Sequence, residues 1–349
     1  MNGQIFYDFI VFISILAIVP FLLKMGKKSK EVNNIEGIYN SITGSVLLIF
    51  ISIFYLISTL IGNPIVVYPF NVLILVWIGL VLGIQGSYIL LKKLKKLDIN
   101  IIKPSFFKNS DFTFHHEIKR KATHLVGLLL IVCYFWLSFP AFMLVQNLII
   151  FAEALNANIW GIVTIQVSPS YVPQMISIFA IVCAGFLITI PDIFRVFNFK
   201  NAIFKKFTKV MREKEKNAVG PHVCLMIGCL IPMILIPNYL ISIAGIIIAV
   251  FSDAMASLVG RKFGKHKLPF SKRTGKTYEG LLGGFLTAFL LPLPVLLWGF
   301  NIGISLILAL VGAIVVSIID VLTPLITDNY LNPIFASFTM FGVYLLLII

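Results

Sequence analysis

The stretch from residue 251 to residue 285 combines residue types that can bind a metal-bound polyphosphate. Asp253 ends an apolar run, about twenty residues rich in Lys, Arg and Gly follow, and Glu279 precedes the next apolar run. A carboxylate can ligate Mg²⁺ or accept a proton, while Lys and Arg neutralise phosphate charge. Glycines let backbone N–H groups approach phosphate oxygens. The stretch therefore predicts a phosphate-binding site.

A second interpretation of this stretch is a plain cytoplasmic loop, because a basic loop between two hydrophobic segments also follows from the positive-inside bias. Asp253 favours a functional site, since a carboxylate at the end of a membrane segment is costly to keep without a task. The letters TGKT at 274–277 do not form a Walker A loop, because Phe270 stands where that loop requires glycine.

The order of residues in this stretch resembles the CTP-dependent lipid-alcohol kinases, which include dolichol kinase, phytol kinase and the CTP-using diacylglycerol kinase. Their signature is an Asp-Ala pair, a small-residue helix end, G-(R/K)-x-x-G, a short basic loop and K-(S/T)-x-E-G. The matching residues are Asp253-Ala254, Ala256-Ser257, Gly260-Arg261, Gly264 and Lys276-Thr277-Tyr278-Glu279-Gly280. Ser252 replaces the glycine that usually precedes the Asp. The resemblance implies CTP as phosphoryl donor, although the residue spacing itself does not distinguish cytosine from adenine.

The composition predicts an all-α, polytopic integral membrane protein with about ten transmembrane helices. Hydrophobic residues make up 59% of the 349 residues, and the mean hydropathy is +1.00. A soluble core could not hide so much apolar surface. The apolar runs long enough to cross a membrane are 5–23, 41–61, 69–91, 122–139, 172–190, 221–237, 239–259, 280–298, 301–320 and 333–349.

The net charge of +14 is concentrated in four segments. All 28 Lys and Arg residues lie in 24–30, 92–121, 195–216 and 261–276. If the first crossing ends on the cytoplasmic side, strict alternation places all four segments there. We therefore expect membrane lipids and an anionic ligand as partners, and no nucleic acid. The four cysteines lie in apolar runs, which favours helix packing over disulfides or zinc.

The domain prediction divides the chain into two parts. Residues 1–91 are predicted to be accessory N-terminal transmembrane helices, and 92–349 a lipid-kinase-like catalytic membrane domain. The segment 140–171 is apolar but contains polar residues and prolines, and the alternation requires an even number of crossings there. We expect a re-entrant or interfacial hairpin on the outside, with two short crossings as the alternative.

The second basic segment, FHHEIKRKATHL at 114–125, opens the fourth predicted crossing. On a helix, Glu117, Lys121 and His124 share one face. Composition alone favours a juxtamembrane cluster that binds anionic lipid headgroups. The kinases, however, carry a similar charged-Arg-Lys-x-x-His entry to a membrane helix. The resemblance implies that Arg120 and Lys121 meet the nucleotide's phosphates and that His124 orients a neighbour or takes part in proton transfer.

Two further segments match the family pattern. The letters REKE followed by Gly220 resemble a turn of the kinases, which implies that Arg212 and Lys214 contribute to nucleotide binding. Asp192 and Arg195 also match, although structural ion pairing explains them equally well. Near the C-terminus, Asp320 is followed by a D-N-x-x-x-P pattern, in which Asp328-Asn329 is by itself typical of a turn. The resemblance implies a second oxygen-rich cluster that faces Asp253 and completes a Mg²⁺ site.

The predicted site combines these segments at the cytoplasmic interface. The catalytic residues are Asp253, His124 and Glu279, with Asp253 as base or metal ligand and Glu279 orienting Lys276 or the metal. The Mg²⁺ ligands are Asp253, Asp328, Asn329 and Asp320. The residues expected to bind CTP are Arg120, Lys121, Gly260, Arg261, Gly264, Lys276, Thr277, Arg212 and Lys214.

The predicted activity is transfer of the γ-phosphate of CTP to a lipid alcohol, with dolichol or another polyprenol as the first expectation. The sequence leaves open which alcohol is used and what the oligomeric state is. A cytidylyltransferase that makes a CDP-lipid is the alternative, but Gly283-Gly284 is not followed by the Asp-Arg of that signature. A transporter is a weaker alternative, because the acidic residues collect at predicted helix ends rather than in mid-membrane.

Overall fold

The structure is a computed structural model that describes residues 3–94, 114–122, 132–154, 171–203, 205, 208, 211–269, 275–322 and 325–349. These residues form helices joined by short connections, with one isolated antiparallel bridge between Lys267 and Thr277. The helices are α1 (Gly3–Leu16), α2 (Val19–Glu31), α3 (Ile35–Leu60), α4 (Phe70–Leu94), α5 (Phe114–Ala122), α7 (Ser138–Ala154), α8 (Val172–Phe197), α9 (Pro221–Leu235), α10 (Tyr239–Phe263), α11 (Tyr278–Leu290), α12 (Leu293–Leu297), α13 (Ile302–Leu322) and α14 (Asp328–Ile348).

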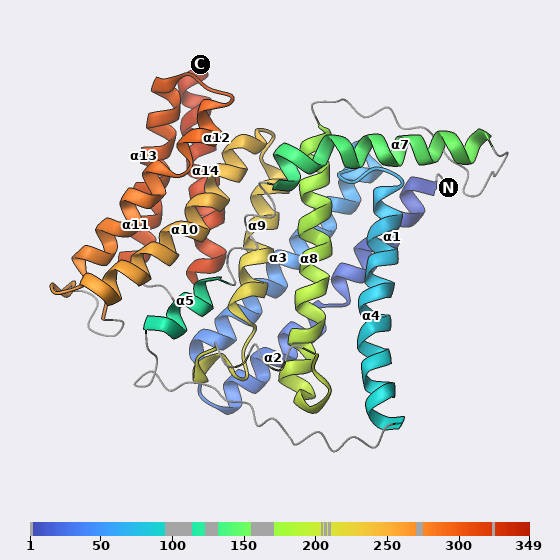
Figure 1. Cartoon of the computed structure of the whole chain (residues 1–349), viewed down its shortest axis with the longest axis horizontal. Coiled ribbons are helices and arrows are strands. Elements are labelled where there is room, and N and C mark those ends of the chain that lie inside the picture. Colours follow the sequence, from blue (N-terminus) through green and yellow to red (C-terminus); the bar gives the residue numbers. More distant parts are fainter. Residues whose placement is uncertain are drawn as a thin grey trace.

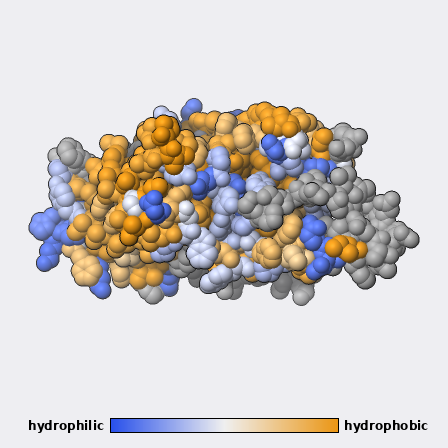
Figure 2. Space-filling view, turned by 90° about the horizontal axis from the view of Figure 1, so that it is seen from above, coloured by the Kyte–Doolittle hydropathy of each residue, from blue (hydrophilic) through white to orange (hydrophobic). Residues whose placement is uncertain are grey.

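The predicted all-α membrane architecture is confirmed. Within the described ranges, eight helical segments are long and apolar enough to cross a membrane, with α1 and α2 counted together. The predicted number of about ten is approximate. The run 221–237 forms α9, which has only 15 residues, and most of the run 122–139 lies outside the described residues. Large apolar side chains such as Trp136, Trp298 and Leu346 are more than 70% exposed, and hydrophobic residues cover much of the face in Figure 2, as lipid contact requires.

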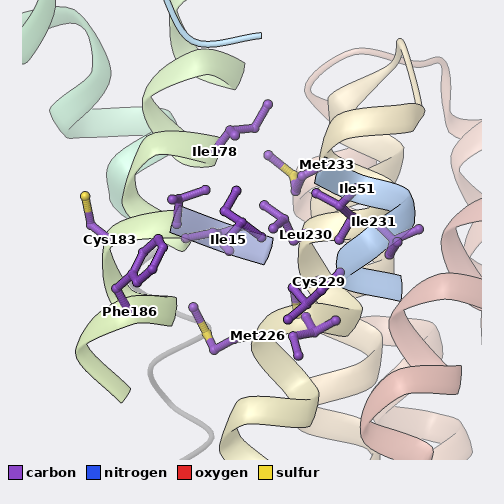
Figure 3. Close-up of a cluster of buried hydrophobic side chains, with 14 of the residues drawn as sticks. Ile15, Ile51, Ile178, Cys183, Phe186, Met226, Cys229, Leu230, Ile231 and Met233 are labelled. Atoms are coloured by element: carbon purple, nitrogen blue, oxygen red, sulfur yellow. The ribbon is translucent and has the colours of Figure 1, made fainter. Parts of the chain in front are cut away.

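One buried cluster joins the N-terminal helices to the centre of the molecule. Figure 3 shows Phe186 on α8 facing Met226 and Leu230 on α9, with Ile15 of α1 and Ile51 of α3 beside them. Helices in a membrane associate through van der Waals packing rather than through exclusion of water. The two halves of the chain therefore form one packed body through α8 and α9.

The C-terminal helices α10, α11, α13 and α14 pack closely at small residues (Figure 1). A Cβ atom added at Gly245 of α10 would lie 1.9 Å from Ser337 Oγ of α14. One added at Gly284 of α11 would lie 2.9 Å from Ala256 Cβ of α10. Small residues at helix crossings allow such close approach. These contacts hold α11 and α14 against α10, whose C-terminal end leads into the basic loop between α10 and α11 (residues 264–277).

The described part of the predicted outside insertion is helical. Its helix α7 follows a π-helical turn at Cys133–Leu137 and contacts α8. In Figure 1, α7 runs across the ends of the upright helices α4 and α8 rather than beside them. The rest of the segment, 155–170, lies outside the described residues.

Candidate functional site

Asp253 lies within a helix rather than at its end. The sequence predicted that this crossing ends near residue 259, but α10 continues to Phe263, ten residues beyond Asp253. The carboxylate of Asp253 forms an ion pair with Lys121 Nζ, which comes from α5. The Lys121 side chain is only 4% exposed and that of Asp253 18% exposed. The fold thus joins two predicted site residues that are 132 positions apart.

Lys276 fixes the basic loop to α13. Its Nζ donates hydrogen bonds of 2.6 Å both to the carboxylate and to the backbone carbonyl of Asp320. The two flanks of the loop are paired, because Leu268 N–H donates to the Lys276 carbonyl and Tyr278 N–H donates to the His266 carbonyl, each at 2.9 Å. The loop therefore returns to the start of α11 at a defined position.

The start of α14 brings a third carboxylate to the same place. Thr327 caps this helix, since its Oγ1 accepts a hydrogen bond from Asn329 N–H at 3.4 Å. Asp328, the next residue, lies within electrostatic range of Asp253 and Asp320 and of the two lysines that pair with them. Three carboxylates from three helices thus lie close to two lysines.

Glu117, for which the sequence predicted no role, contacts three arginines of the site. Its side chain is fully buried, and Oε1 accepts hydrogen bonds of 2.6 Å from Arg120 and from Ser257 Oγ. Its other oxygen, Oε2, lies 3.6 Å from Arg212 and 3.5 Å from Arg261. One buried carboxylate therefore gathers three arginines from three separate segments. The available signal was its position one turn before Lys121 on the same helix face.

The charges around Glu117 shift several pKa values. Burial acts to raise the pKa of Glu117, but Arg120, Lys121 and Ser257 together outweigh it and lower the pKa to about 2. Burial acts to lower the pKa of Arg120, but the nearby carboxylates, Glu117 foremost, together outweigh it and raise that pKa. Burial together with the neighbouring Arg120 lowers the pKa of Arg212. A buried cation beside a like charge is stabilised when an anionic ligand binds next to it.

Asp192 and Arg195 brace the turn that carries Arg212. Their ion pair has a distance of 2.6 Å and is almost fully buried. Arg195 donates to the carbonyls of Glu215, Lys216 and Ala218, and Asp192 accepts from Gly220 N–H. The contacts of this pair are therefore structural. They fix the backbone of residues 215–220 and with it the position of the turn that carries Arg212.

The glycines of the signature bring α10 and α11 together. A Cβ atom at Gly280 would lie 2.7 Å from the Ala256 carbonyl, and one at Gly264 would lie 2.6 Å from Thr277 Oγ1. Thr277 caps α11 by accepting from Gly280 N–H at 3.2 Å. Close packing thus requires glycine at these positions, and Gly264 and Gly280 also line the cavity described below. Their approach to phosphate stays a prediction.

Glu279 contacts the basic loop at a different point from the one expected. Its carboxylate lies 2.6 Å from His266 Nδ1 and also accepts from His266 N–H. Lys276 instead donates to Asp320, and Glu279 does not line the cavity described next. His124, the other predicted catalytic residue besides Asp253, lies outside the described residues.

The segments described above enclose one cavity of about 610 Å³, a volume typical of small-molecule sites. Among the described residues, seven cationic side chains line it, namely Arg120, Lys121, Arg212, Lys214, Arg261, Lys267 and Lys276. Five acidic side chains line it as well, namely Glu36, Glu215, Asp253, Asp320 and Asp328. Asn329, Gly260, Gly264 and Thr277 complete the set of predicted residues that reach it. Cations outnumber acids, which suits a polyanionic ligand.

The donor set at the acidic end of the cavity is compatible with Mg²⁺. Across the described ranges, no three His, Cys, Asp or Glu side chains stand close enough to hold a metal by themselves. Mg²⁺ does not need such a cage, because it is usually bound by one or two carboxylates with waters and substrate phosphates as the other ligands. Asp328, Asn329 and Asp320 offer oxygens of this kind at the cavity.

The amino-acid sequence of the chain matches a known protein family. The sequence model of the cytidylyltransferase family matches residues 118–327, which is more than half of the chain. The match spans α5 to the residue before α14 and leaves α1 to α4 outside it. No solved structure matches the chain.

Proposed function

The chain belongs to the cytidylyltransferase family, which includes dolichol kinase, phytol kinase and the CTP-dependent diacylglycerol kinase, and we propose that it is a membrane kinase for a long-chain lipid alcohol. It transfers the γ-phosphate of CTP to the alcohol's hydroxyl at the cytoplasmic face. One observation carries the proposal: Asp253, Asp320 and Asp328 share a single cavity with Lys121 and Lys276.

The cationic side of the cavity suits the triphosphate. Arg120, Arg212 and Arg261 all lie against the buried Glu117, which fixes their planes without cancelling their combined charge. Guanidinium groups can bind phosphate oxygens through two parallel hydrogen bonds. In phosphoryl transfer the protein mostly positions the reactants and stabilises charge. We therefore assign this arginine cluster to the nucleotide's phosphates.

The lipid alcohol enters between α11 and α13. Leu281 and Ile319 line the cavity, while their chain neighbours Leu282 and Ile318 are 57% and 51% exposed on the outer surface. Apolar residues of α11 and α13 thus stand both at the cavity and on the adjacent outer surface. A hydrocarbon chain can remain in the membrane while its hydroxyl reaches Asp253.

The transfer itself requires few protein groups. Asp253 accepts a hydrogen bond from the lipid hydroxyl and takes its proton as the hydroxyl oxygen bonds to the γ-phosphorus. The bond between the γ-phosphorus and the bridging oxygen breaks, and CDP leaves with that electron pair. Lys121 and Lys276 stabilise the negative charge on the transferred group and on CDP. Asp328, Asn329 and Asp320 would hold Mg²⁺, which would further neutralise the phosphate oxygens.

Glu279 has a supporting role in this scheme. Its contacts with His266 hold the flank of the basic loop that leads to Lys276. We therefore propose that Glu279 positions the loop rather than touching the reactants.

The test is incubation of the purified protein with γ-labelled CTP and a polyprenol, with phytol and diacylglycerol in parallel. The proposal predicts label in a lipid phosphate and release of CDP. Release of pyrophosphate with a CDP-lipid product would instead establish a cytidylyltransferase. Absence of both products with every alcohol would contradict an enzymatic role of this kind and leave transport as the alternative.

A further inference from the structure

The connection between α2 and α3 forms a wall of the cavity, although it lies outside the matched family region. Asn34 of this connection, with Glu36, Gly37 and Asn40 of the first turns of α3, lines the same cavity as Asp328 and Lys214. We propose that Asn40 is a positioning residue that holds the start of α14, and with it Asp328 and Asn329, against the cavity. The effect on turnover rests on the proposed function, whereas the effect on local structure does not.

Asn40 makes two contacts with the first turn of α14. Its Oδ1 accepts a hydrogen bond of 2.8 Å from Thr327 N–H, and its backbone carbonyl accepts one of 3.2 Å from Tyr330 O–H. These contacts join residues almost 290 positions apart. Asp328 and Asn329 lie between the two bonded residues, so both ends of this turn are fixed to α3.

Packing around Tyr330 supports the same assignment. The Tyr330 side chain is completely buried, and a Cβ atom at Gly44 of α3 would lie 2.3 Å from its hydroxyl oxygen. Glycine at position 44 therefore provides the space in which the tyrosine reaches Asn40. The fit is specific to this pair of helices, because any side chain at Gly44 would displace the ring.

The same connection also holds the opposite wall. Asn34 Nδ2 donates to the Lys214 carbonyl at 2.6 Å, and Ser29 Oγ donates to the Asn217 carbonyl at 3.0 Å. Glu36 forms an ion pair of 2.5 Å with Lys214. The α2–α3 connection thus links the turn beside the arginine cluster to the start of α14. Replacement of Asn40 should loosen only the α14 side.

The experiment compares Asn40→Ala with Asn40→Asp, which keeps an oxygen acceptor of the same reach. The matched control is Ser52→Ala, which removes a buried hydroxyl of α3 that bonds only within its own helix. Hydrogen exchange of a peptide covering 325–331 and steady-state kinetics are measured for each. We expect Asn40→Ala to speed exchange of this peptide and to reduce kcat about tenfold or more, since small misplacements cost that much. Ser52→Ala should stay near the wild-type values in both measurements. Asn40→Asp is compared by exchange alone, because it adds a negative charge to the cavity, and its exchange should stay near the wild-type rate.

The outcomes are distinguishable. Wild-type exchange and wild-type kcat in Asn40→Ala would overturn the inference. Exchange of 325–331 that is as fast in Asn40→Asp as in Asn40→Ala would overturn it as well. Faster exchange in a protein whose wild-type form transfers no phosphate would support the positioning role and count against the proposed function. If Asn40→Ala does not fold, Tyr330→Phe replaces it; this variant removes the second hydrogen bond together with the contact of the Tyr330 hydroxyl with Cys224. Unchanged exchange of 325–331 in that variant would then overturn the inference.

Discussion

At the scale of single residues, the site is built from carboxylates that are already paired with cations. Lys121 pairs with Asp253, Lys276 with Asp320, and Arg120 with Glu117. Each pair holds its side chains in place, and an arriving triphosphate can share the cations. Both members of the first two pairs line the cavity, whereas in the third pair Arg120 lines it and Glu117 is buried behind the arginine cluster, so the pairs differ in what a mutation should change.

Lys276 should act mainly on nucleotide affinity. We expect Lys276→Ala to weaken binding of CTP about tenfold, because one charge-assisted hydrogen bond to phosphate contributes roughly 1.5–3 kcal/mol. Equilibrium binding of labelled CTP to the purified protein measures this. The control is Lys262→Ala, since Lys262 is an exposed residue of the same basic region that does not line the cavity. Equal CTP affinity in wild type and Lys276→Ala would remove Lys276 from the nucleotide site.

Glu117 should make stability depend on acid pH. Its pKa falls from 4.5 in the unfolded chain to about 2, so its stabilisation is complete above pH 4.5 and is lost as the pH falls toward 2. The shift corresponds to a contribution on the order of 3 kcal/mol. The melting temperature of Glu117→Gln in detergent should therefore lie below that of wild type at pH 7, and the gap should narrow below pH 4.5. A gap that is constant from pH 7 to pH 3 would contradict the ion-pair account.

At the scale of elements, the signature glycines determine how α10 meets α11. Gly280 should not tolerate a methyl group, because its Cβ would lie 2.7 Å from a backbone carbonyl. Alanine normally stabilises a helix relative to glycine by up to about 1 kcal/mol. We expect Gly280→Ala to lower the melting temperature, whereas Gly83→Ala on α4, where nothing lies within 4 Å, should leave it equal or higher. Equal shifts in both variants would show that the crossing is not tight.

The elements also show what could be predicted from the sequence. The apolar runs indicated a helical membrane protein, and the ordered motifs indicated that Asp253, Lys276 and Asp328 belong together. The helix ends were less predictable, because Gly260 and Arg261 continue α10 instead of beginning the loop. After α8, the described residues Phe199–Asn201 form a short 3₁₀ turn.

Contacts between distant segments were beyond prediction, because periodicity reports which face is apolar and not which partner covers it. Glu117 was visible as a neighbour of Lys121, but nothing in its spacing revealed the approach of Arg212 and Arg261. Asn40 lies in a region without motifs, and its partner Thr327 is 287 positions away. Both residues became apparent only when the helices were placed in space.

At the scale of the whole molecule, the cavity lies where an N-terminal helix pair meets the C-terminal helices. The α2–α3 connection, the 212–217 turn, α5, α10, the basic loop and the start of α14 all contribute side chains. A water-soluble nucleotide and a membrane-bound alcohol can meet only at such a boundary, with polar residues inside and apolar helix faces around it. The N-terminal helices, predicted to be accessory, supply part of the wall.

The measurement that tests the central claim most directly compares the fate of the α- and γ-phosphates of CTP in wild type and in an Asp253 variant. Wild type, Asp253→Asn and the exposed-carboxylate control Glu31→Gln are given CTP that carries different labels on its α- and γ-phosphates, together with a polyprenol. The account predicts a wild-type and Glu31→Gln lipid product with the γ label alone, and a rate at least about 100-fold lower in folded Asp253→Asn. An α label in the lipid, or Asp253→Asn transferring at the wild-type rate, would contradict it.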